Sequence, residues 1–178
     1  MIVSNAFQKL PEIFIDNPTN STEYIKILGR LNSQRTYKYI KSQYVQPNKY
    51  IGKFKVMIPE ANGTGKLGEP LSSPLIGKPM VAATDTFLSI GPFSNETEAN
   101  NCLKYIKTKF VRVLLAVKKA TQHNPRSVWQ YIPIQNFALN SDIDWSKSIS
   151  KIDEQLFKKY NLSDSEINFI KTKVEAMN

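Results

Sequence analysis

The chain contains one cysteine and one histidine among its 178 residues. Cys102 therefore has no partner for an internal disulfide, as expected of a protein from a reducing, cytoplasmic compartment. One cysteine and His123 also cannot supply the ligand sets of the usual zinc sites. Cys102 lies within an apolar periodic segment, which predicts a small buried hydrophobic residue rather than a reactive thiol.

Long apolar runs are missing as well. None approaches the roughly 20 residues that a membrane-spanning helix needs, and residues 1–9 lack the pattern of a secretory signal. The sequence thus predicts neither a membrane partner nor export. Hydrophobic residues still make up 41% of the chain, so a buried core is expected.

Acidic residues are absent from two long stretches. Residues 24–59 contain eight basic side chains, residues 99–141 contain seven, and neither stretch contains an acidic one. The net charge is +9, although residues 131–178 carry six basic and seven acidic side chains. A polyanion is the simplest partner for the two basic stretches, because each phosphate contact gains from counterion release. The alternative is a generally basic protein whose lysines are only solvated.

Local patterns predict an α+β fold. Residues 20–90 are expected to form a small, mostly antiparallel sheet, in which Gly29 ends the first strand and residues 60–79 form a long surface loop. Alternating or β-branched residues place candidate strands at 24–28, 35–45, 53–58 and 81–90.

Helices are predicted for the second half of the chain. Asn95 begins a capping-box pattern, and apolar residues then recur every three or four positions, which predicts one long amphipathic helix over residues 95–120. A C-terminal helical pair is expected at 149–160 and after Ser163, where a second capping box begins.

Three strings of residues resemble catalytic motifs but are incomplete. Residues 63–66, GTGK, lack the upstream glycine and the following Ser or Thr of a phosphate-binding loop. Residues 16–19, DNPT, lack the second proline and the aromatic residue that amino-methyltransferases use to hold a flipped base. Asp142 and Asp144 lack the second carboxylate strand of a Mg²⁺-dependent nuclease, so we expect them to cap a turn. The isolated chain is therefore expected neither to methylate nor to cut DNA.

An ordered series of strings in the second half resembles a known family. These strings are NETEANN at 95–101, YIKTKFVR at 105–112, KATQHNP at 119–125, Trp129, YIPIQNF at 131–137, SDIDWSKSI at 141–149 and IDEQLFKKY at 152–160. Together they resemble the C-terminal target-recognition region of bacterial type II restriction enzymes that are fused to, or act as, adenine-specific DNA methyltransferases. The resemblance covers roughly residues 50–177, and residues 1–50 resemble the same region more loosely.

The resemblance implies a DNA-reading domain, here placed at residues 1–145, with a helical extension at 146–178 packed on it. The catalytic methyltransferase or nuclease domain of the parent enzyme would be its protein partner. This chain departs from the whole-family pattern because it lacks the cofactor loop and the catalytic tetrapeptide. S-adenosylmethionine, and Mg²⁺ if the parent also cleaves, would therefore be bound by the parent and not by this chain.

Basic and amide side chains that could read duplex DNA occur in three clusters. Arginine and amide side chains suit base edges, and lysines suit phosphates. The first cluster is a turn between strands and the strand after it, where alternating spacing could place side chains on one face; it contains Arg30, Asn32, Gln34, Arg35, Lys38, Lys41 and Gln43. The second follows the long helix and contains Lys118, Lys119, Gln122, His123 and Arg126. The third is the tip of the long loop, which ends at Lys66.

Each cluster also has a plainer interpretation: a polar hairpin loop, a capped helix end, and a solvated loop, respectively. The predicted function is sequence-specific recognition of double-stranded DNA. The alternative is a protein-interaction module that docks a methyltransferase or nuclease subunit. Because the C-terminal helix is nearly neutral, Lys171 and Lys173 are expected to lie outside the DNA-binding surface.

Overall fold

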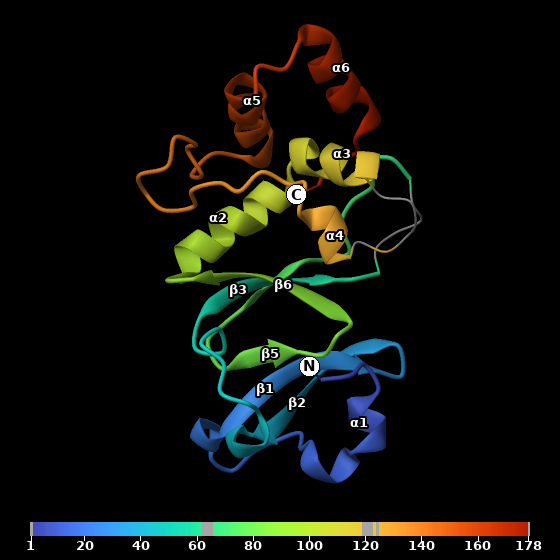
Figure 1. The fold of residues 1–178 in the computed structure, drawn as a ribbon, viewed down its shortest axis with the longest axis vertical. Coiled ribbons are helices and arrows are strands. Elements are labelled where there is room, and N and C mark those ends of the chain that lie inside the picture. The colour runs from blue at the N-terminus through green and yellow to red at the C-terminus, as the bar shows by residue number, and fades with distance from the viewer. Residues whose placement is uncertain (1, 62–65, 119–122, 124, 178) are drawn as a thin grey trace.

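Figure 1 shows the fold in a computed structural model that describes residues 2–61, 66–118, 123 and 125–177. Two small sheets and a set of helices confirm the predicted α+β class. The elements are stacked in layers along the long axis, from the N-terminal segment at one end to the C-terminal helices at the other.

The first sheet is built on the predicted hairpin. β1 (Tyr24–Leu31) and β2 (Gln34–Lys41) pair antiparallel, and the turn residues Asn32 and Ser33 have φ values of 50° and 63°. Positive φ at both turn residues is the type I′ geometry that matches the twist of the flanking strands. β5 (Val81–Ala83) pairs with β1 in parallel, so the strand order is β2-β1-β5.

Gly29 lies inside β1 and does not end it, contrary to the sequence prediction. A Cβ atom at this position would lie 2.6 Å from a ring carbon of Phe7. Phe7 belongs to α1 (Ala6–Lys9), which covers the outer face of the first sheet together with η1 (Pro11–Ile13). The glycine is therefore required by the close approach of an aromatic ring, a tertiary contact that the local sequence does not reveal.

A second sheet, antiparallel and ordered β4-β3-β6, replaces the single sheet that the sequence predicted. Its strands are β3 (Phe54–Pro59), β4 (Leu75–Gly77) and β6 (Phe87–Phe93). β4 lies within the predicted loop, and the predicted strand at 81–90 is divided between β5 and β6. A small core of Leu28, Met57 and Phe87 joins the two sheets face to face.

Helices cover the other face of the second sheet (Figure 1). They are α2 (Glu96–Lys107), α3 (Lys109–Lys118) and the short α4 (Arg126–Trp129). The prediction of one helix over 95–120 is wrong, because the backbone turns to an extended conformation at Thr108. The predicted start of α2 is confirmed: the Asn95 side chain accepts a hydrogen bond of 2.9 Å from the backbone N–H of Glu98.

The predicted C-terminal pair is present as α5 (Ile149–Lys159) and α6 (Asp164–Lys173), with the capping box at Ser163. Ile152 of α5 and Ile170 of α6 belong to the same buried cluster as Val56 of β3. The boundary predicted between residues 145 and 146 therefore runs through the largest core of the protein. Within the described ranges, no helix combines the length and apolar character needed to cross a bilayer.

Candidate functional site

The break between α2 and α3 is stabilised by a carboxylate from α5. The Asp153 side chain accepts hydrogen bonds from the backbone N–H of Lys109 at 3.0 Å and of Phe110 at 2.9 Å. The Thr108 hydroxyl oxygen accepts a third, of 3.2 Å, from the Val111 N–H. The first turn of α3 thus obtains acceptors for N–H groups that have no partner within the helix.

A buried arginine holds the same region together from the other side. The Arg112 guanidinium donates to the backbone carbonyls of Gly68 at 2.8 Å and Lys107 at 3.2 Å, and also to that of Glu175. Burial lowers the pKa of Arg112, and the carboxylates of Asp153 and Glu175 oppose this shift. Burial raises the pKa of Asp153, against its two backbone N–H donors and the charge of Arg112.

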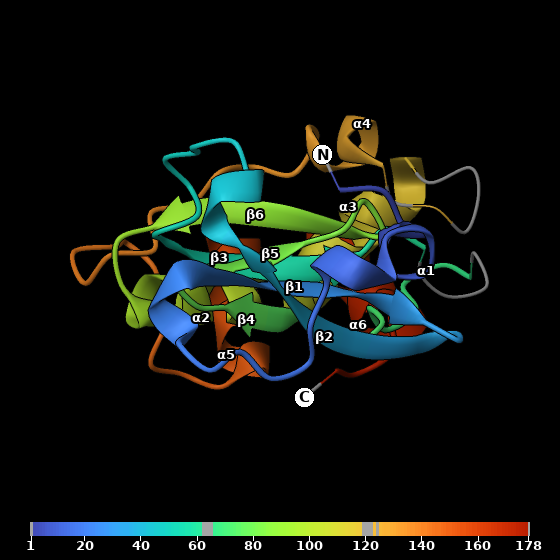
Figure 2. The same cartoon turned by 90° about the horizontal axis from the view of Figure 1, so that it is seen from below.

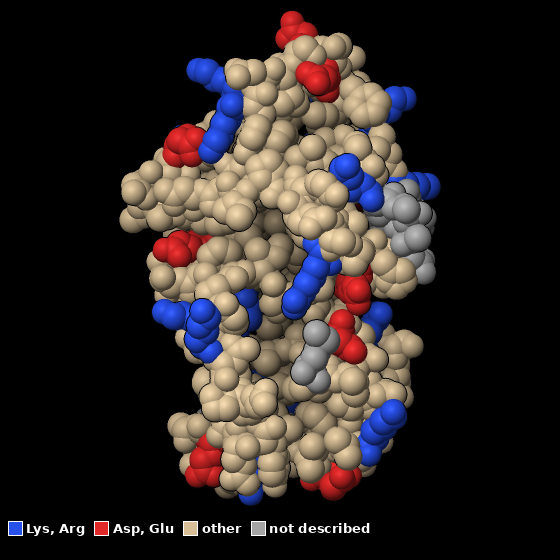
Figure 3. Space-filling model, in the orientation of Figure 1, with Lys and Arg blue, Asp and Glu red and all other residues tan. Residues whose placement is uncertain are grey.

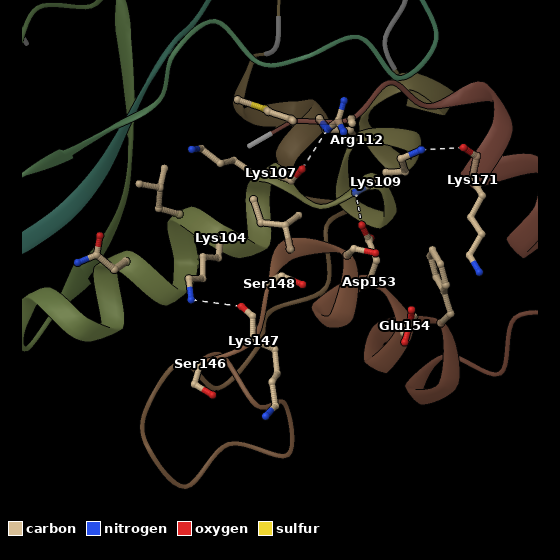
Figure 4. A pocket seen from close by; sticks show the side chains of 17 residues that line it. Lys104, Lys107, Lys109, Arg112, Ser146, Lys147, Ser148, Asp153, Glu154 and Lys171 are labelled. Carbon is tan, nitrogen blue, oxygen red and sulfur yellow. Dashed lines mark hydrogen bonds between the residues drawn. The ribbon is translucent and has the colours of Figure 1, made fainter.

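A cavity of about 850 Å³ opens beside this junction (Figure 4). We call it the basic pocket, because six cationic side chains line it together with the start of α5: Lys104, Lys107, Lys109, Arg112, Lys147 and Lys171. The described acidic residues in its lining are Asp153, which caps α3, and Glu154, which pairs with Lys151 at 2.8 Å. Positive charge therefore exceeds negative charge around the pocket.

Several of these cations are held by carbonyl oxygens. The Lys104 ammonium donates to the carbonyls of Trp145 at 2.7 Å and Lys147 at 3.3 Å, and the Lys109 ammonium donates to that of Lys171 at 2.7 Å. Figure 4 shows the bonds to Lys147 and Lys171. A carbonyl satisfies a donor but, unlike a carboxylate, leaves the full positive charge in place. The N-terminal turn of α5, which also lines the pocket, adds the positive end of a helix dipole. The arrangement favours a multiply charged anion.

The basic pocket was not predicted as a site from the sequence. Three of its lysines, Lys104, Lys107 and Lys109, do belong to the second acid-free stretch, which was predicted to contact a polyanion. Lys147 and Lys171 come from the nearly neutral C-terminal part, and only the packing of α5 and α6 onto α2 and α3 brings them to the same cavity. Lys171, expected to lie outside any DNA-binding surface, therefore lines this cationic cavity.

The two arginines of the hairpin have different surroundings. They are cross-strand neighbours. The Arg35 guanidinium donates to the carbonyls of Ser72 and Ser73, both at 2.8 Å, and lies 5.6 Å from the centre of the Phe87 ring. It thereby anchors the segment that leads into β4. All four polar residues at the turn, Arg30, Asn32, Gln34 and Arg35, are exposed, but the guanidinium of Arg35 is engaged by the two carbonyls. Arg30 is thus the hairpin arginine available to an external partner.

The lysines of β2 do not share one face, contrary to the sequence interpretation. Lys38 lies on the same face as the core residue Ile40 and pairs with Asp16 at 2.8 Å, with 17% of its side chain exposed. Lys41, an odd-numbered position of the strand, lies on the opposite face. Gln43 lies beyond the strand in η3 (Ser42–Tyr44) and is exposed. The three side chains therefore do not form a row, because strand residues alternate between faces.

The second and third predicted clusters are dispersed. Lys118 lies 4.3 Å above the Tyr131 ring, His123 forms an isolated β-bridge with Ala61, and Arg126 lines a groove between the two sheets. Lys66 is exposed. Lys119 and Gln122, like residues 62–65 of the third cluster, lie outside the described residues.

Of the two aspartates predicted to cap a turn, Asp144 does so, whereas Asp142 forms an ion pair with α5. Asp144 accepts hydrogen bonds from the Ser146 backbone N–H at 3.0 Å and hydroxyl at 2.6 Å, and these lower its pKa. Asp142 pairs with Lys159 at 2.7 Å. Across the described ranges, no group of three or more His, Cys, Asp or Glu side chains has an arrangement that could hold a metal ion.

Two of the helices that line the basic pocket, α5 and α6, lie toward the same side of the molecule as the edge strands β2 and β4. Figure 2 shows these four elements and the C-terminus in its lower half, whereas β6 and α4 lie in the upper half. The upper side in Figure 2 is the face drawn in Figure 3, where basic and acidic side chains are interspersed.

Comparison with protein-family models, with curated protein sequences and with solved structures returned no match. The resemblance to restriction–modification enzymes thus stays a prediction from the sequence.

Substitution of the two hairpin arginines distinguishes a role in stability from a role in recognising a DNA sequence. Arg35→Ala removes two solvent-exposed hydrogen bonds to backbone carbonyls and should lower the free energy of unfolding by about 1 kcal/mol. If the hairpin contacts base edges, Arg30→Ala should leave stability unchanged but should weaken the preference for a selected DNA sequence over random DNA by roughly 1–3 kcal/mol, the value of a bidentate contact to guanine. Urea denaturation and competition binding measure the two effects. Equal loss of selected and random DNA binding in Arg30→Ala would mean that this residue only contacts phosphates.

Proposed function

We propose that this chain binds duplex DNA as the target-recognition domain of a restriction–modification enzyme. The observation that supports DNA binding most directly is the basic pocket, where six cationic side chains face two carboxylates that already have partners. Phosphates are the anions that such a surface meets along a duplex, and their neutralisation releases condensed counterions.

Sequence reading is assigned in this proposal to the β1–β2 hairpin. A two-stranded ribbon fits the major groove of B-form DNA. Arg30, Asn32 and Gln34 lie at or next to its turn and are exposed, so their guanidinium and amide groups are free to meet base edges. Lys41, at the opposite end of the hairpin from the turn, would contact a phosphate further along the duplex. Lys38 and Arg35, which are engaged within the protein, would support the hairpin instead.

The proposal includes a partner and a compartment. The catalytic part of the parent enzyme, which would bind S-adenosylmethionine and, for cleavage, Mg²⁺, would receive the DNA that this domain selects. Such an enzyme acts in the cytoplasm, which suits the single buried thiol of Cys102. Burial raises the pKa of this thiol to about 12, so it is protonated and unreactive at neutral pH.

Salt dependence of DNA binding tests the proposal. If several phosphates are neutralised together, log affinity should fall linearly with log salt, with a slope of about −0.9 per phosphate contacted. We expect on the order of four to eight contacts for one domain. Fluorescence anisotropy with a labelled duplex at increasing potassium chloride measures the slope. A flat response would contradict DNA binding through the basic pocket.

A protein-interaction module is the second candidate, and one observation favours it. Ile134 and Leu139, both 96% exposed, lie with the exposed Tyr131 on the segment between α4 and α5. Exposed apolar side chains of this size often mark contacts with another protein. Tight binding to a methyltransferase or nuclease subunit, unaffected by salt and lost in Ile134→Ser/Leu139→Ser, would support this alternative.

A further inference from the structure

A groove of about 420 Å³ lies between the two sheets, on the face drawn in Figure 3, which is hollowed between the two halves of the molecule. We call it the inter-sheet groove. Its walls are the segment before β3, the strands β5 and β6, and the start of α4. Figure 2 shows β6 and α4, which contribute to its lining, on the opposite side of the molecule from α5 and α6, which line the basic pocket.

The inter-sheet groove contains a buried lysine. Lys55 of β3 lies at an irregularity in the pairing of β3 with β6, and only 7% of the residue is exposed. Its ammonium group donates to the carbonyl of Val81 in the first sheet at 2.7 Å and to that of Ile51 at 3.3 Å. Two of its three N–H donors are thus used, and the third is available to the groove.

Lys55 has no carboxylate partner among the described residues. Those that line the groove include no Asp or Glu, and the Lys55 ammonium group donates to carbonyl oxygens. Burial lowers the pKa of Lys55 to about 8, because desolvation disfavours the ammonium form. Buried ammonium groups are normally paired, and an apolar side chain such as that of the adjacent core residue Met57 would fill this space without the desolvation cost.

A second cation reaches the inter-sheet groove from α4. Arg126 lines it opposite the sheets, and it is exposed, so its guanidinium can turn toward a ligand. The hydroxyl groups of Tyr50 and Ser89 and the amide of Asn48 supply further hydrogen-bonding groups in the same lining. The groove therefore presents two positive charges and several neutral polar groups.

We propose that the inter-sheet groove binds the phosphate group of a small phosphate monoester, with Lys55 and Arg126 as its two cationic ligands. A phosphate monoester carries close to two negative charges at neutral pH, which matches the two cations. The fork of Arg126 suits two phosphate oxygens, and Lys55 acts as a buried point charge. This site is independent of the proposed DNA binding, because it uses other residues on another face.

The pH dependence of binding follows from the same geometry. The titratable groups that line the groove are Lys55, Tyr50 and Arg126. A bound dianion favours the ammonium form of Lys55, so binding takes up a proton where the free protein has lost it. Phosphate affinity should therefore fall as the pH rises above about 8, while the ligand keeps its charge.

Calorimetric titration of the full chain with inorganic phosphate and with glycerol phosphate tests the proposal. Lys55→Met and Arg126→Gln should each weaken binding by roughly tenfold or more, the loss expected for one charged hydrogen bond. Lys53→Met, an exposed lysine two positions away that does not line the groove, is the matched control and should bind as the unchanged protein does. A short duplex with and without a 5′-phosphate distinguishes a DNA end from a free monoester as the source.

Thermal unfolding of the same variants tests whether Lys55 stabilises the fold instead of binding a ligand. Lys55→Met should raise the melting temperature, because it removes an uncompensated buried charge. Binding that is unchanged in both groove variants, or no phosphate binding by the unchanged protein, would overturn the proposal. So would a lower melting temperature of Lys55→Met together with unchanged affinity in Arg126→Gln. If Lys55→Met does not fold, two other measurements test whether the groove binds phosphate. These are the phosphate affinity of Arg126→Gln and the fall in affinity of the unchanged protein above about pH 8.

Discussion

Replacing Asp153 by alanine should lower the free energy of unfolding by about 3 kcal/mol, since it leaves one buried and one partly buried backbone N–H group without acceptors. These are the N–H groups of Lys109 and Phe110 at the start of α3. The substitution also removes the negative charge that faces the buried Arg112. Because α3 and α5 share the largest core, the loss should appear as a shift of the whole cooperative transition. Urea denaturation followed by tryptophan fluorescence measures it.

Glu154→Ala is the matched control for this prediction. Glu154 is the next residue of α5, is exposed, and pairs with Lys151 on the surface, so its removal should leave the unfolding curve unchanged. Asp153→Asn should fall between the two, because its amide keeps one acceptor oxygen but turns an N–H donor toward the second backbone N–H. A wild-type unfolding curve for Asp153→Ala would show that the α2–α3 break does not depend on this carboxylate.

Removing two charges from the basic pocket should weaken DNA binding on the order of tenfold or more at physiological salt. The double variant Lys107→Gln/Lys171→Gln keeps side chains of similar length and removes two cations that line the cavity. If both contact phosphates, the slope of log affinity against log salt should also become shallower by about 1.8. Anisotropy titrations at several salt concentrations measure both quantities.

Lys173→Gln is the control for charge alone. Lys173 lies on α6 two positions from Lys171, is exposed, and does not line the basic pocket. Its loss should change DNA affinity little, whereas the sequence analysis expected neither lysine of this helix to contribute. If the double variant and Lys173→Gln bind DNA equally well, the DNA-binding surface lies elsewhere. Phosphate binding in the inter-sheet groove should be normal in all these variants, which keeps the two proposals separable.

Features that depend on neighbouring residues were predictable from the sequence. Asn32 and Ser33 accept positive φ in a two-residue turn, so the hairpin was found close to its true position. The caps at Asn95 and Ser163 were found because a side chain three residues away completes each one. The α+β class followed from the same local signals, since the period of the apolar residues reports the element that carries them.

The site depended on contacts between distant segments. The apolar stripe runs on through Thr108, and nothing near it indicates that Asp153, 45 positions further on, caps a new helix there. Likewise, Arg35 was taken for a DNA contact because its carbonyl partners, Ser72 and Ser73, lie in another part of the chain. Cations and acceptors can be counted in a sequence, but their pairing is decided by packing.

The sequence by itself determined the charge of this protein, its fold class and the position of its main turn and helix starts. Only the tertiary structure decided where that charge acts. In the folded chain Lys38 pairs with Asp16, and Arg35 and Arg112 donate hydrogen bonds to backbone carbonyls. Lys171 lines the same pocket as lysines more than sixty positions away in the sequence. The physical reason is that a charged side chain acts through what lies within a few ångströms of it, and that distance is set by the folded chain.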